Sequence, residues 1–62
     1  MMVAPKSGEI IRSKFNGRTF TIEMVGETQV VLEERDLSIR FVTTLDDLRS
    51  FYEYAGELNF RH

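Results

Sequence analysis

The feature that most constrains the fold is the pair Asn16-Gly17, which lies between two stretches of alternating apolar and polar residues. Both residue types tolerate positive φ, so the pair favours a two-residue β-hairpin turn. Such a turn places Ser13 opposite Phe20. We therefore predict that a first strand over 9–15 and a second strand over 18–25 form an antiparallel hairpin.

This register divides the side chains of the hairpin between two faces. One face is apolar and is the predicted core face: Ile11, Phe15, Phe20, Ile22 and Met24. The opposite face is polar: Arg12, Lys14, Thr19, Thr21 and Glu23. The turn signal and the hydrophobic alternation thus support the same register.

The next turn, Gly26-Glu27-Thr28, is compatible with a two-residue or a three-residue loop. The two-residue loop would place Glu33 on the core face, where an unpaired carboxylate costs several kcal/mol. The three-residue loop instead places Val30 and Leu32 on the core face. We therefore predict the three-residue loop.

A third turn at Arg35-Asp36 continues the meander. A two-residue loop there pairs Leu32 with Ile39, so that apolar residues again face each other. The third and fourth strands are accordingly predicted over 29–34 and 37–43.

After the fourth strand the pattern takes a helical period. Thr44 followed by Asp47 resembles a capping box, and Gly56 is a typical helix stop. Between them, one stripe is apolar: Leu45, Leu48, Phe51, Tyr52 and Ala55. This spacing predicts an amphipathic helix.

These elements predict an α+β fold, in which a four-stranded antiparallel meander is followed by one C-terminal amphipathic helix. A short fifth strand through Leu58 and Phe60 would close a small SH3-like barrel, and without it the sheet stays open. Residues 1–8 are expected to form a flexible tail and 9–62 a single small domain. This general layout resembles that of many small barrel-like proteins encoded by bacteria and their phages, and the resemblance implies no particular functional residue.

The composition argues against an enzyme. Among its 62 residues the chain has no cysteine, and its one histidine is His62. Ser–His and Cys–His pairs and Cys-ligated zinc sites therefore cannot be built, and no Gly-rich phosphate loop is present. We expect no cofactor and no metal. No apolar run approaches the ~20 residues that span a bilayer, so we expect a cytoplasmic protein without a membrane partner.

Three basic residues, Arg12, Lys14 and Arg18, surround the predicted hairpin turn. Their functional interpretation is contact with a phosphate backbone. Against it, the expected outer face offers no aromatic side chain for a base to stack on, and Glu9 and Glu23 lie nearby. A nucleic-acid-associated accessory factor is therefore the alternative function, not the favoured one.

The favoured function is a protein-interaction module or a homo-oligomer, because association adds buried area to a chain this small. Four apolar residues are predicted on the outer face: Ile10, Val25, Val31 and Val42. On an open sheet they would form a continuous apolar streak, whereas in a closed barrel they would be scattered singly. Tyr54 lies off the apolar stripe of the helix and would suit a partner contact. The candidate interaction surface comprises Ile10, Arg12, Lys14, Arg18, Val25, Val31, Arg40, Val42 and Tyr54.

Overall fold

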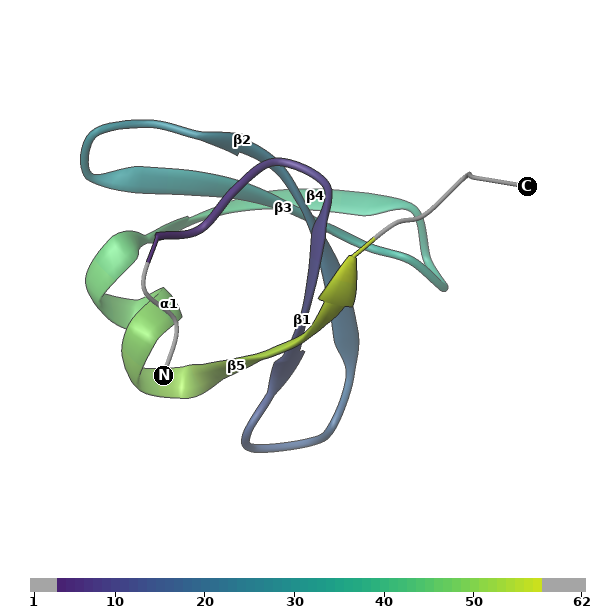
Figure 1. Cartoon of the computed structure of the whole chain (residues 1–62). Helices are drawn as coiled ribbons and strands as arrows, with labels where there is room; N and C mark the ends of the chain where they lie inside the picture. The colour runs from purple at the N-terminus through teal and green to yellow at the C-terminus, as the bar shows by residue number, and fades with distance from the viewer. Residues whose placement is uncertain (1–3, 58–62) are drawn as a thin grey trace.

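The computed structural model describes residues 4–57 and shows one antiparallel sheet with a short helix (Figure 1). The elements in chain order are β1 (Glu9–Ser13), β2 (Thr19–Val25), β3 (Gln29–Glu34), β4 (Ile39–Thr44), α1 (Leu45–Phe51) and β5 (Tyr52–Glu57). The five strands lie in the order β4-β3-β2-β1-β5. The sheet is open, with β4 and β5 at its two edges. The predicted α+β class and the antiparallel meander are therefore confirmed.

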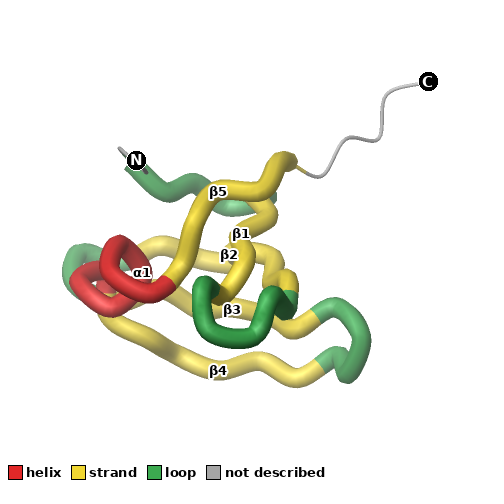
Figure 2. Tube along the Cα trace, turned by 90° about the horizontal axis from the view of Figure 1, so that it is seen from below, coloured by secondary structure: helices red, strands yellow, loops and turns green. Residues whose placement is uncertain are grey.

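The sheet bends strongly from one edge to the other, as twisted strands do (Figure 2). In that view β4 lies along the bottom, while β5 crosses at the top beside β1. The helix α1 lies at one end of the sheet and connects these two edge strands. It thus occupies the C-terminal part of the chain, as predicted.

The concave side of the sheet holds the core. Its fully or almost fully buried members come from four elements: Ile11, Phe20, Ile22, Val30, Leu32 and Leu48. The Phe20 ring meets the rings of Phe41 and Tyr52 edge-on, at centroid distances of 5.5 Å and 5.6 Å. Edge-to-face contact adds about 0.5–1.5 kcal/mol per aromatic pair beyond the area that it buries. Phe20 therefore links β4 to β5 across the core.

The Asn16-Gly17 hairpin forms, but its loop is longer than predicted. Ile11 pairs with Phe20, so the predicted two-residue turn is wrong and the register is displaced by two residues. The Asn16 side chain accepts a hydrogen bond from the Arg18 N–H at 2.9 Å, and Gly17 has φ 75°. A displacement by two residues does not by itself change the face on which a side chain lies.

The longer loop removes Phe15 from the core. Phe15 was predicted among the core residues, yet it lies in the loop and its surface is 76% exposed. The prediction was wrong because the strand ends at Ser13, two residues earlier than expected.

A β-bulge in β2 removes Met24 from the core as well. Ile22 pairs with Leu32, as the three-residue loop predicted, but the register shifts before Met24 pairs with Val31. One extra residue in a strand reverses the facing of the residues after it. Met24 therefore points to the outer face and is 66% exposed.

The turn after β3 spans 35–38 and includes Ser38 at φ 56°. Leu32 consequently pairs with Phe41 and not with the predicted Ile39. Here too the displacement is two residues, so Leu32 stays in the core.

The helix begins as predicted and ends early. Thr44 is the N-cap, and its hydroxyl accepts a hydrogen bond from the Asp47 N–H at 3.0 Å. The predicted helix continued to Gly56, but the chain becomes extended at Tyr52, where φ is −129°. Residues 52–57 form β5 instead, because pairing with β1 satisfies their backbone groups.

The fifth strand therefore exists at a different place from the one predicted. It is Tyr52–Glu57, whereas the predicted Leu58 and Phe60 lie outside the described residues. Gly56 is not a helix stop but part of a bulged pairing with Ile10, and its φ is 153°.

Part of the segment expected to be a tail contacts the sheet. The Gly8 N–H donates to the Ile22 carbonyl at 2.8 Å, and the Ser7 hydroxyl donates to the Glu23 carbonyl at 3.0 Å. These bonds hold residues 7–8 against β2.

Candidate interaction surfaces

Three apolar side chains form a row across the outer face of the sheet. Met24 on β2 pairs with Val31 on β3, which in turn pairs with Val42 on β4. Val42 is 57% exposed, and Val31 between its neighbours is partly buried. We call these three residues the apolar row. The sequence predicted Val31 and Val42 as candidate residues but missed Met24, because the β2 bulge has no signature in the alternation.

The apolar row ends at the free edge of β4. This strand has β3 on one side, and on the other side no segment of the described chain follows it (Figure 2). Ile39, which alternation places on the concave side, is still 52% exposed. The edge is thus open on both faces of the sheet.

The hydrogen-bond pattern shows which backbone groups β4 leaves free. The Leu45 N–H donates to the Thr28 carbonyl at 2.9 Å and continues the register of the β3–β4 ladder. Alternate residues of an antiparallel strand bond to the same neighbour, so the odd-numbered residues of β4 bond to β3. The N–H groups of Arg40, Val42 and Thr44 and the C=O groups of Arg40 and Val42 consequently point away from the sheet, whereas the Thr44 carbonyl, as the N-cap, accepts the first hydrogen bond of α1.

The other edge strand, β5, is better protected. Its pairing with β1 contains a register shift between Ile10 and Ile11, and its exposed residues include Glu53 and Glu57. Bulges and charges are the usual protection of sheet edges. The β3–β4 ladder has no register shift, and Arg40 is the only charged residue of β4.

Beside the apolar row lies a pair of carboxylates, Glu23 and Glu33, with Arg40 opposite Glu33. A side-chain hydrogen bond with Glu23, followed by partial burial and the negative charge of Glu23, raises the pKa of Glu33. The positive charge of Arg40 opposes this shift. The two carboxylates therefore repel each other when both are ionised.

Replacing Glu33 with glutamine should make the protein more stable near neutral pH. Because the pKa of Glu33 is raised on folding, the native state binds more protons than the unfolded state, and the free energy of unfolding falls as pH rises through the folded-state pKa. Glu33→Gln removes this loss, so its advantage over the wild type should shrink towards about pH 4. Urea denaturation at low salt across the acidic to neutral range measures it. Glu27→Gln, in the exposed loop before β3, is the control; an equal gain there would contradict the assignment.

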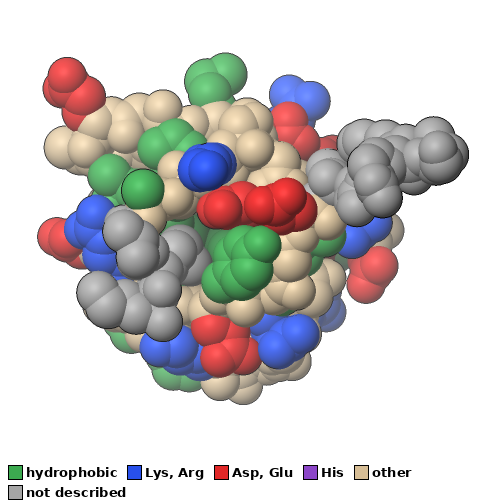
Figure 3. Space-filling model, in the orientation of Figure 1, with side chains coloured by type: hydrophobic (Ala, Val, Ile, Leu, Met, Phe, Trp, Pro, Cys, Tyr) green, Lys and Arg blue, Asp and Glu red, His purple; other side chains and the backbone are tan. Residues whose placement is uncertain are grey.

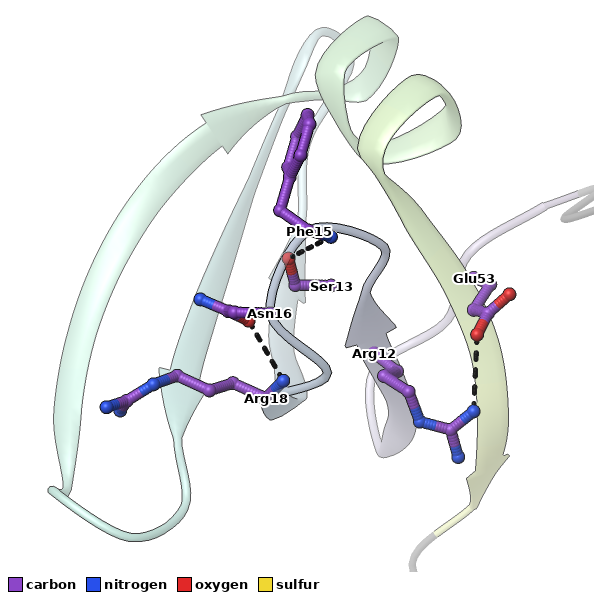
Figure 4. Close-up of polar contacts among 6 residues, drawn as sticks. All are labelled: Arg12, Ser13, Phe15, Asn16, Arg18 and Glu53. Carbon is purple, nitrogen blue, oxygen red and sulfur yellow. Dashed lines mark hydrogen bonds and ion pairs between the residues drawn. The ribbon is translucent and has the colours of Figure 1, made fainter.

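The basic residues of the hairpin are partly neutralised by acids. Arg12 forms an ion pair with Glu53 at 3.2 Å (Figure 4), and Arg18 forms one with Glu34. Lys14 is exposed and has no ion pair with any residue from 4 to 57. The three predicted basic residues do lie around one hairpin, but Arg12 is paired with a carboxylate of β5 and Arg18 with a carboxylate of β3.

An exposed aromatic pair lies next to Lys14. The rings of Phe15 and Phe51 are 5.3 Å apart and tilted by 40°. The Lys14 N–H donates to the Phe51 carbonyl at 2.9 Å, and the Phe15 N–H donates to the Ser13 hydroxyl at 3.1 Å (Figure 4). The hairpin loop is thus attached to the end of α1. This pair was missed because both residues were predicted to lie in the core.

The remaining candidate residues lie apart from the apolar row. Ile10, on the outer face of β1, is partly buried. Val25 pairs with buried Val30, so the bulge has moved it to the concave side, where it is 38% exposed. Tyr54 belongs to β5 and not to the helix; burial, followed by the charges of nearby carboxylates, raises its pKa. The structure therefore brings together only Val31, Arg40 and Val42 of the nine predicted residues beside the free edge of β4.

A shallow hollow of about 350 Å³ lies between the β2–β3 turn and the start of α1. Acidic, basic and apolar side chains alternate on the face that Figure 3 shows. Residues 4–57 contain no group of three side chains suited to a metal ion and no helix long and apolar enough to cross a membrane.

Comparison of the chain with models of known protein families, with curated proteins and with solved structures found no match.

Proposed function

We propose that the chain is a non-catalytic protein-interaction module that binds an extended protein segment as an additional strand beside β4. The observation that carries this proposal is the free edge of β4, where Arg40 and Val42 direct both backbone groups, and Thr44 its N–H, away from the sheet. In strand addition the main chain supplies the affinity and alternate side chains supply the specificity.

The side chains around this edge support the same function. On the outer face the apolar row continues to Val42, and on the concave side Ile39 is exposed and Phe41 is only partly buried. An added strand would cover apolar surface on both faces while pairing the free backbone groups. Uncovered, a regular edge of this kind favours non-specific association, so a dedicated partner is the simplest reason for its persistence.

We also propose that the bent sheet is an SH3-like barrel left open between β4 and β5. The fifth strand beside β1 and the T-shaped contacts of Phe20 with Phe41 and Tyr52 support this description. A cytoplasmic location is part of the proposal, since the chain carries no cysteine.

Photo-crosslinking in the producing cell tests the proposed edge. A benzophenone side chain in place of Arg40 should form a covalent adduct with the bound strand. The adduct should disappear when Val42→Pro is added, because proline removes an outward N–H without breaking the β3–β4 ladder. It should persist with Val42→Thr, which keeps the N–H and the side-chain shape.

The control is the same benzophenone side chain in place of Ser50, which is exposed on α1. An adduct at position 50 of the same mass, or an adduct at position 40 that survives Val42→Pro, would show that binding does not use the β4 edge. Absence of any adduct at position 40 would also overturn the proposal.

A nucleic-acid-associated role is the second candidate, and one observation favours it. Phe15 is exposed beside Lys14, so a base-stacking side chain does accompany a basic residue at the hairpin. We place it second because Arg12 and Arg18 are engaged by carboxylates.

A further inference from the structure

We infer that the strand added to β4 is β4 of a second copy of this chain, antiparallel to the first, with Val42 opposite Val42. This inference rests on the proposed function, since it names the partner of the same edge. The interface of a closed twofold dimer must be self-complementary about its axis. The β4 edge meets that condition in its backbone groups, its apolar surface and its charges.

The backbone groups select the register. The outward residues of β4 are Arg40 and Val42, with both backbone groups, and Thr44, with its N–H, so a second β4 must place its own outward residues opposite these three. With Val42 on the axis, Arg40 of each copy lies opposite Thr44 of the other. The two Val42 residues then exchange both of their hydrogen bonds, and the Thr44 N–H of each copy pairs with the Arg40 carbonyl of the other.

Three other registers are worse. Centring the axis on Arg40 places two like charges directly opposite each other, which is destabilising. Centring it on Phe41 pairs Arg40 with Val42 and leaves Thr44 opposite Ser38, which lies in the turn at φ 56°. Centring it on Thr44 would require α1 of the other copy to be extended, because that helix starts at Leu45.

The apolar surface supports the same axis. With Val42 opposite Val42, the apolar row of one copy meets the apolar row of the other, so that Met24, Val31 and Val42 continue without interruption across the outer face. On the concave side Phe41 meets Thr43, and exposed Ile39 meets the start of the other helix at Leu45. Both exposed apolar surfaces of the edge are covered at once.

The charges are also complementary. Arg40 lies opposite Thr44 of the other copy. In that copy Asp46 follows Thr44 by two residues. The Asp46 side chain is 96% exposed, and within residues 4–57 it forms one ion pair, a 3.8 Å contact with Arg49. Each copy thus offers a cation to a carboxylate of the other, and the pair occurs twice. A gain in buried area also suits a 62-residue domain, which by itself buries a smaller fraction of its surface than a larger domain does.

Disulfide trapping of purified protein tests the pairing, and the natural chain contains no cysteine that would interfere. In the proposed register the two Val42 Cα atoms are about 5.5 Å apart, within the range of a disulfide. Val42→Cys should therefore form a covalent dimer at least about tenfold faster than Arg40→Cys, whose two copies are separated by four residues along the strands. Ser50→Cys on α1 gives the rate of random collision. Sedimentation of the unmodified chain should show a dimer at concentrations where Val42→Pro is a monomer.

A faster reaction of Arg40→Cys than of Val42→Cys would overturn this register. A monomeric wild type, together with a Val42→Cys rate equal to that of Ser50→Cys, would overturn self-pairing altogether. The proposed function would survive the second result if the cellular adduct at position 40 has the mass of another protein and still depends on the Val42 N–H. It would fall with the inference if no such adduct forms.

Discussion

Leu48→Ala should destabilise the domain by about 3 kcal/mol, within the 2–5 kcal/mol typical of truncating a buried leucine. Leu48 is fully buried and is the one buried side chain of α1. Small domains are stable by roughly 0.05–0.15 kcal/mol per residue, so this loss takes a large share of the total. Urea denaturation followed by circular dichroism should show the midpoint falling steeply or the folded baseline disappearing.

The matched control is Arg49→Ala, the next residue of the same helix, whose side chain is exposed. It should change stability by no more than about 0.5 kcal/mol, as surface substitutions usually do. If Leu48→Ala proved as mild as Arg49→Ala, α1 would not be packed on the sheet as described.

Proline substitutions at adjacent residues of β4 should differ sharply in effect. Thr43 pairs with fully buried Val30, and its N–H bonds to β3 in the inferred pattern, so Thr43→Pro should cost about 3 kcal/mol or more. The Val42 N–H points away from the sheet, so Val42→Pro should cost less than about 1 kcal/mol. Both are measured by urea denaturation of dilute protein, where association contributes nothing to stability.

Thr43→Ala and Val42→Thr separate the loss of the side chain from the loss of the N–H. If Val42→Pro were as damaging as Thr43→Pro, the Val42 N–H would already be bonded within the protomer. The β4 edge would then not be free, and both the proposed function and the self-pairing would be wrong.

The predicted registers of the β1–β2 and β3–β4 pairs were wrong, yet most of the predicted core residues are buried. Both the hairpin and the β3–β4 turn are displaced by two residues, and side chains on a strand alternate with a period of two. Ile11, Ile22 and Leu32 are therefore buried as the alternation predicted. The N-cap at Thr44 was also predictable, because it depends on Asp47 three residues away.

The errors share a different cause. Met24 was predicted in the core, but the β2 bulge places it on the outer face. Phe15 was also predicted in the core, but β1 ends at Ser13, so Phe15 lies in the loop. Tyr52 is compatible with two positions: the apolar stripe of a helix, or the concave face of a strand. The choice was made by β1, whose free side pairs with 52–57, and by the contact of Tyr52 with Phe20. None of these partners is close in the sequence.

Part of the candidate interaction surface was also predictable from the sequence, and part was not. Alternation alone identified Val31, Arg40 and Val42 as residues of one outer face. The addition of Met24 and the discovery that β4 is an uncovered edge required the assembled sheet, because an edge is defined by which strand has no neighbour.

By itself the sequence determined the strand order of the meander, the buried face of the strands outside the β2 bulge and the start of the helix, since each depends on residues a few positions apart. The tertiary structure decided where the helix ends, which strand β5 joins and which edge is left open. Those outcomes depend on backbone groups and rings from distant segments competing for the same partners. The free edge of β4, on which the proposed function rests, is the product of that competition.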